Sequence, residues 1–176
     1  MNKTALIVAA ALALAGCASK PAPPAWKSNA ADALKGYSDA YLKGNTAVAE
    51  PEFARARSEM ASTGRPDLVA MAELVRCATR VASLEYDDCP GFAALAQDAT
   101  EGERAYAAYL GGRWQGLDAS LLPEQHQAAV RTNAAGTASV LAAIADPLSR
   151  MVAAGALMQV GRIAPTDVAL AAETAS

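Results

Sequence analysis

The sequence predicts an all-α fold, a compact bundle of about six or seven short helices joined as hairpins. Alanine is the commonest residue, and only 5% of the residues are aromatic. Alanine has the highest helix propensity, whereas runs of β-branched and aromatic residues, which favour strands, are absent from the sequence. Apolar residues recur at helical spacing, and prolines and glycines interrupt this spacing often enough to separate short helices.

Three helices are expected before residue 85. Ser28 can cap a first helix, which ends near Gly44. Pro51 suits the first position of a second helix, and Gly64 suits its end. A third helix, residues 67–84, carries two apolar rows, which predicts a central place in the core. The rows consist of Leu68, Met71, Val75, Ala78 and Ala82, and of Leu74, Cys77, Val81 and Leu84.

Four further helices are expected in the second half of the chain. Proline begins each of them, because its fixed φ and missing N–H suit the first helical position. The first two are expected over residues 90–110 and 123–144, and Pro147 and Pro165 fit the starts of the others. Small residues are frequent in these last helices, which predicts a closely packed, buried hairpin.

A weak internal repeat gives a tetratricopeptide-like alternative to the bundle. The triplet Ala40-Tyr41-Leu42 recurs as Ala108-Tyr109-Leu110, offset by two periods of about 34 residues. The spacing of Gly44, Ala49, Phe53 and Ala56 resembles the second half of such a repeat. One period later the same positions carry unrelated residues, so an accidental match between helical hairpins is the preferred interpretation.

The N-terminus has the pattern of an export signal. Lys3 supplies a positive charge, and residues 5–15 form an apolar run. As a helix this run spans about 16 Å, against about 30 Å of membrane hydrocarbon, so it is too short for a comfortable membrane span.

The four residues Leu14-Ala15-Gly16-Cys17 resemble the lipobox of bacterial lipoproteins. The resemblance implies cleavage before Cys17 and attachment of fatty acyl groups such as palmitate to that cysteine. Several acyl chains make a stable membrane anchor. Because Ala18 stands where many inner-membrane lipoproteins have aspartate, we expect the periplasmic face of the outer membrane, with the inner membrane as the alternative.

Three segments follow from this interpretation. Residues 1–16 are expected to be a signal peptide, residues 17–27 a lipid-anchored tether, and residues 28–176 a single helical domain. The tether is rich in proline, and its residues 18–25 reach about 25 Å at about 3.1 Å per residue.

Once Cys17 is lipidated, Cys77 and Cys89 remain as a pair in an oxidising compartment, which predicts a disulfide. The bridge is feasible if the chain reverses sharply after Glu85, but not if the third helix continues to Asp88. The spacing is not Cys-x-x-Cys, so catalytic redox chemistry is not expected.

Arg113 and Trp114 lie in the glycine-rich stretch 111–116 and form a possible binding loop. Both residue types are enriched where proteins bind one another. The alternative, which we prefer for Trp114, is that its ring folds back to cover the core.

No catalytic set is recognisable, and we expect neither an enzyme nor a cofactor or metal site. His126 is the only histidine, and we expect it at the surface or at a helix terminus. The sequence holds no Gly-x-Ser-x-Gly motif, and the Asp87-Asp88 pair lacks the alternating spacing of a calcium loop.

We therefore expect a non-enzymatic binding or assembly factor for an envelope protein. The net charge is −3 and no basic run is present, so nucleic acid is not an expected partner. One alternative is an immunity or inhibitor lipoprotein against a periplasmic effector. Another is a small-ligand-binding or enzymatic domain, which would need a concave site near Tyr37, Tyr41, Glu103 or His126.

Overall fold

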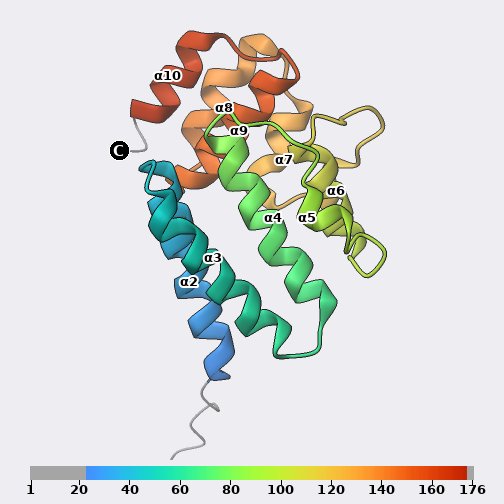
Figure 1. Ribbon diagram of the computed structural model, residues 1–176. Coiled ribbons are helices and arrows are strands. Elements are labelled where there is room, and N and C mark those ends of the chain that lie inside the picture. The colour runs from blue at the N-terminus through green and yellow to red at the C-terminus, as the bar shows by residue number, and fades with distance from the viewer. Residues whose placement is uncertain (1–22, 174–176) are drawn as a thin grey trace, which may run out of the picture.

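The structure, a computed structural model, describes residues 23–173, and all regular elements in this range are helical (Figure 1). The prediction of an all-α fold is therefore confirmed. The predicted signal peptide, Cys17 and the first part of the predicted tether lie outside the described residues. The α-helices are α2 (Ala25–Leu42), α3 (Thr46–Ala61), α4 (Pro66–Ala82), α5 (Pro90–Ala93), α6 (Glu101–Leu110), α7 (Glu124–Arg131), α8 (Thr137–Ala143), α9 (Pro147–Gln159) and α10 (Pro165–Glu173).

Helix α4 lies at the centre of this arrangement, as its two apolar rows predict. In Figure 1 it runs between the α2–α3 hairpin on one side and the later helices on the other. It contributes buried residues to two apolar clusters, a smaller one with α2 and α3 and a larger one with α6, α7, α8 and α9. Val69 and Ala72 face the smaller cluster, whereas Leu74 and Val81 face the larger one.

Helices α4 and α9 approach each other closely in the larger cluster. A Cβ atom on Gly155 would lie 2.2 Å from the backbone oxygen of Val81, so only glycine fits at this crossing. The Tyr86 hydroxyl donates to the backbone oxygen of Gly155 at 3.1 Å. The small side chains of Ala153, Ala154 and Ala156 are buried beside it. The close packing expected from these small residues is present in α9. The predicted buried hairpin is wrong in its other parts, because α8 buries only Thr137 and Leu141 and α10 only Ala171.

The predicted disulfide between Cys77 and Cys89 is confirmed, with a Cα–Cα distance of 5.4 Å. Helix α4 ends at Ala82, and Leu84 then adopts a positive φ of 60°. The chain reverses there, so Cys89 returns to the side of the helix that carries Cys77.

Two predicted helix starts are wrong. Helix α2 begins at Ala25, and the Ser28 hydroxyl donates to the backbone oxygen of Ala25 instead of capping the helix. Residues 25–27 are therefore helical, although they fall within the expected tether. Pro51 lies inside α3, which already begins at Thr46 after the tight turn at Gly44. This turn, in which the Asn45 N–H donates to the backbone oxygen of Ala40 at 2.9 Å, determines where α3 begins, and Pro51 does not.

Two predicted helices are each divided in two. Residues 90–110 form α5 and α6, because Thr100 and Glu103 start a new helix with reciprocal hydrogen bonds. The Thr100 hydroxyl accepts from the Glu103 N–H at 3.2 Å, and the Thr100 N–H donates to the Glu103 carboxylate at 2.7 Å. Residues 123–144 form α7 and α8, separated at Asn133, whose side chain accepts from the Gly136 N–H.

The lengths of the later helices do not repeat. They range from four residues in α5 to 13 in α9, so the tetratricopeptide-like alternative does not describe residues 90–173. Among the helices of residues 23–173, none combines the length and apolarity that a membrane crossing requires.

Candidate ligand-binding pocket

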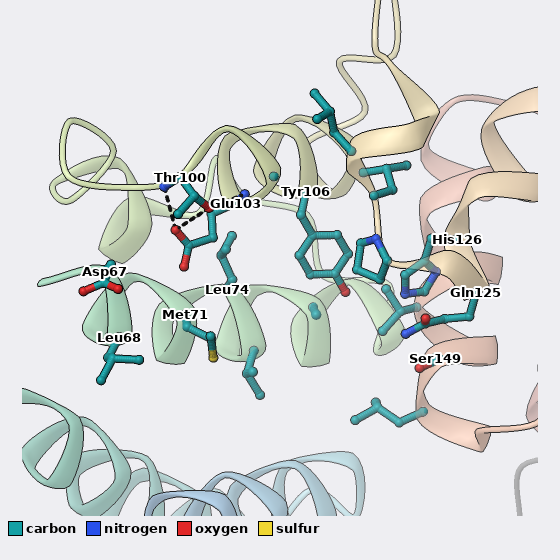
Figure 2. A pocket seen from close by; sticks show the side chains of 18 of the residues that line it. Asp67, Leu68, Met71, Leu74, Thr100, Glu103, Tyr106, Gln125, His126 and Ser149 are labelled. Carbon is teal, nitrogen blue, oxygen red and sulfur yellow. Dashed lines mark hydrogen bonds between the residues drawn. The ribbon is translucent and has the colours of Figure 1, made fainter. Parts of the chain in front are cut away.

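A pocket of about 660 Å³ lies between α4, α6, α7 and α9 (Figure 2). Its volume falls in the range of pockets that hold small molecules, about 300 to 1,000 Å³. Residues far apart in the sequence form its wall. They are Arg65, Asp67, Leu68, Met71, Leu74, Val75 and Ala78 near or in α4, Thr100, Gly102, Glu103 and Tyr106 at α6, Leu121, Leu122, Pro123, Gln125 and His126 at α7, and Leu148, Ser149 and Val152 in α9.

The apolar wall consists largely of one of the two rows predicted on α4. Leu68, Met71, Val75 and Ala78 of that row line the pocket. The other row packs mainly in the core, through Leu74, Cys77 and Val81, and of these three only Leu74 also lines the pocket. Met71 is 44% exposed, and Leu68 and Val75 are half-buried. The row therefore leaves an apolar surface that the rest of residues 23–173 covers only in part.

The aromatic side of the pocket holds two polar atoms that lack a hydrogen-bond partner in the described part of the chain. The His126 side chain is only 1% exposed, and its ring stacks against Tyr106 with ring centres 5.6 Å apart. Its Nδ1 lies 3.5 Å from the Tyr109 hydroxyl. Within residues 23–173, neither Nε2 of His126 nor the Tyr106 hydroxyl has a hydrogen-bond partner. Figure 2 shows Tyr106 pointing from α6 toward α4 and His126 beside Gln125.

Burial keeps this side of the pocket uncharged at neutral pH. It lowers the pKa of His126 to about 4, against a smaller opposing effect of Asp146, so the imidazole is neutral. It also raises the pKa of the Tyr106 hydroxyl, which stays protonated. Of the two positions expected for His126, the helix terminus is correct, since His126 lies in the first turn of α7, whereas the surface is therefore wrong. The reason is that Tyr106 and Tyr109, from another helix, pack on its ring.

The charged residues of the wall already have partners. Arg65, which lies just before α4, pairs with Asp67 in the first turn of that helix. The hydrogen bond from Arg65 lowers the pKa of Asp67. Glu103 accepts hydrogen bonds from Thr100 at the start of α6. In Figure 2 Asp67 and Glu103 lie at the opposite end of the pocket from His126 and Gln125. The pocket thus has a charged end and an uncharged aromatic end.

Arg113 and Trp114 do not line this pocket. Trp114 is 8% exposed, its indole N–H donates to the Tyr109 oxygen at 2.8 Å, and its ring stacks on that of Tyr109. The alternative in which Trp114 covers the core is therefore correct. Arg113 is exposed and lies 3.5 Å from Asp88.

Two of the four residues considered for a small-ligand site, Glu103 and His126, line the pocket. The other two lie elsewhere. Tyr37 is fully buried in the α2–α3–α4 cluster, and the Tyr41 hydroxyl donates to Glu85 at 2.8 Å.

One group of possible metal ligands, Cys77, Asp87 and Cys89, has its atoms within 4.8 Å of one another. The two sulfurs are bonded to each other, so neither is a thiolate that a metal would bind. Asp87 instead pairs with Arg80 at 3.0 Å and accepts from the Cys89 N–H.

Sequence reasoning missed Tyr106, Gln125 and Ser149 as pocket residues. The available signal was the α4 row that begins at Leu68, because a helix with two apolar rows has more apolar surface than one core contact covers. Comparison of the chain with models of protein families, with curated proteins and with solved structures gives no match.

Proposed function

We propose that the protein is a non-enzymatic binding protein of the bacterial envelope, anchored through Cys17 to the periplasmic face of the outer membrane. We further propose that its binding site is the pocket between α4, α6, α7 and α9. The observation that carries the proposal is a pocket of about 660 Å³ with apolar walls and with two polar groups, on Tyr106 and His126, that have no hydrogen-bond partner among residues 23–173.

The composition of the pocket wall supports binding over catalysis. Each Å² of apolar surface that a ligand removes from water contributes about 25 cal/mol of favourable free energy to binding, and a few polar groups then orient the ligand. A histidine whose pKa is about 4 is a weak base at neutral pH, which disfavours a role in proton transfer.

The disulfide supports an envelope location. Disulfides persist in oxidising compartments such as the periplasm and are rare in the cytosol. The Cys77–Cys89 bridge therefore agrees with the export that the resemblance of Leu14-Ala15-Gly16-Cys17 to a lipobox implies.

The anchor is tested by replacing Cys17 with serine in the full-length protein. We expect the variant to incorporate no labelled palmitate and to lose the membrane attachment of the wild-type protein. Unchanged labelling and unchanged membrane fractionation would show that Cys17 is not the anchor.

The binding site is tested with the mature protein in lipid nanodiscs. A hydrocarbon chain that carries a photoreactive diazirine is added and irradiated, and the labelled peptides are mapped by mass spectrometry. We expect labelling of the pocket helices, and we expect Val75→Trp to suppress it because the indole fills the pocket. Val48→Trp is the matched control, since Val48 is 48% exposed on α3 and does not line the pocket.

Equal labelling of the pocket in both tryptophan variants would contradict the proposed site. If the chain labels no pocket peptide and crosslinking in cells joins these helices to another protein, the assembly-factor interpretation replaces ligand binding.

A further inference from the structure

We infer that the pocket binds a lipophilic alcohol, with its hydrocarbon part along α4 and its hydroxyl between Tyr106 and His126. The inference rests on the proposed binding function and adds the chemical class of the ligand.

The hydrocarbon part is assigned from the long apolar wall of α4. At about 1.5 Å per residue, Leu68 to Ala78 cover about 15 Å, which suits a carbon chain of about a dozen atoms. Leu148 and Val152 of α9 also line this space. A chain in this position would cover Leu68, Met71 and Val75, three apolar α4 side chains of the pocket wall that are exposed or half-buried.

The hydroxyl is assigned from the two unpartnered polar atoms. The Tyr106 hydroxyl can donate or accept a hydrogen bond. Nε2 of His126 donates if the Tyr109 hydroxyl donates to Nδ1, and accepts if Nδ1 carries the proton instead. An alcohol both donates and accepts, so it complements His126 in either tautomer. A ketone or ester only accepts and complements one tautomer alone.

An anionic head group does not suit this end of the pocket. The rings of Tyr106 and His126 are both neutral near pH 7, because burial raises one pKa and lowers the other. Arg65 is the cation among the pocket residues, and it already pairs with Asp67 near the other end. An anionic group beside His126 would therefore be buried without a cation to pair with, which is costly, and the negative charge of Asp146 near His126 would disfavour it further.

The test compares two photoreactive chains of equal length on the mature protein in nanodiscs, one ending in a hydroxyl and one in a methyl group. For each chain, labelling of the pocket peptides is expressed as the ratio of variant to wild type, so differences in partition into the lipid cancel. The variant is Tyr106→Phe. It keeps the ring that stacks on His126 and removes a hydroxyl that has no partner among residues 23–173. Tyr41→Phe is the matched control outside the pocket.

We expect Tyr106→Phe to lower labelling by the hydroxyl chain about fivefold, which is the effect of one hydrogen bond, and to leave the methyl chain unchanged. Tyr41→Phe is expected to change neither ratio. His126→Leu should act like Tyr106→Phe, whereas His126→Gln, which keeps a polar side chain, should retain more of the labelling by the hydroxyl chain.

Two failures are distinguishable. If neither chain labels the pocket of the wild-type protein, the proposed binding function itself is wrong. If both chains label the pocket, and the labelling ratios of the two chains are equal in Tyr106→Phe and in His126→Leu, the binding function stands and the assignment of an alcohol is wrong. Thermal unfolding of each variant checks that it folds. If the His126 variants do not fold, the comparison of Tyr106→Phe with the wild type is sufficient for the test.

Discussion

At the scale of single residues, His126 is the side chain whose surroundings most change its chemistry. Its ring packs against Tyr106 and Tyr109 of α6, lines the pocket together with Tyr106, and is 1% exposed. Burial penalises the charged imidazolium, so the folded protein binds a proton there only near pH 4. The unfolded chain binds the same proton near pH 6.5. The stability of the fold is therefore linked to pH through this one residue.

We expect acidification to destabilise the protein between pH 6.5 and about 4. In this window the unfolded chain is protonated at His126 and the folded chain is not, so stability present at neutral pH is lost as the pH falls. The total loss from this group is about 3 kcal/mol, at 1.36 kcal/mol for each unit of pKa shift.

Urea unfolding at pH 7 and pH 4.5 measures this effect. His126→Gln should lose less stability than the wild type between the two pH values, because glutamine does not titrate. Carboxylates such as Asp67 also destabilise the fold on acidification, but they do so equally in both proteins. Identical losses in the two proteins would contradict the role assigned to His126.

At the scale of elements, the crossing of α4 and α9 determines how closely the larger cluster packs. Gly155 meets the backbone of α4, and the Tyr86 hydroxyl holds the same turn of α9. The Cys77–Cys89 bridge holds the returning chain against α4 near this crossing. The pocket lies along the same two helices, so its width depends on this contact.

We expect Gly155→Ala to destabilise the protein by about 1–3 kcal/mol, because the added methyl group must push a backbone carbonyl aside. The control is Gly36→Ala in α2, where the new Cβ would lie 3.3 Å from the flexible side chain of Glu52. There the higher helix propensity of alanine makes a neutral or stabilising effect the expected result. Chemical denaturation measures the free energy of unfolding of both variants. Equal effects of the two substitutions would contradict the close contact between α4 and α9 at Gly155.

At the scale of the whole molecule, α4 joins two apolar clusters that share few other contacts. Residues of α4 are buried in the α2–α3 cluster and in the larger cluster alike. Neither cluster keeps its core if α4 unfolds. The described part of the chain should therefore behave as one cooperative unit.

We expect a single unfolding transition in the Trp26→Phe variant. The remaining tryptophan, Trp114, is buried in the larger cluster and reports on it by fluorescence, whereas far-UV circular dichroism reports on all helices. The two denaturation curves should coincide. A fluorescence transition displaced from the dichroism transition would show that the clusters unfold separately.

Much of the fold could be predicted from local signals in the sequence. The two rows of residues 67–84 predicted a central helix. The pairing of Cys77 with Cys89 was predicted because Cys17 was expected to be lipidated, which leaves an even pair of cysteines. Other local signals were present but not recognised. Thr100-Glu101-Gly102-Glu103 has the spacing of a capping box, and it divides a segment that proline and periodicity alone predicted as one helix.

The sequence by itself determined that the chain is helical and that α4 has more apolar surface than one neighbour can cover. The pocket was decided only by the tertiary structure. Its wall comes from four helices spread over residues 65–152, and apolar periodicity specifies a buried face without specifying what covers it. The burial of His126 has the same cause, because the pKa of a side chain depends on neighbours that folding brings from distant positions.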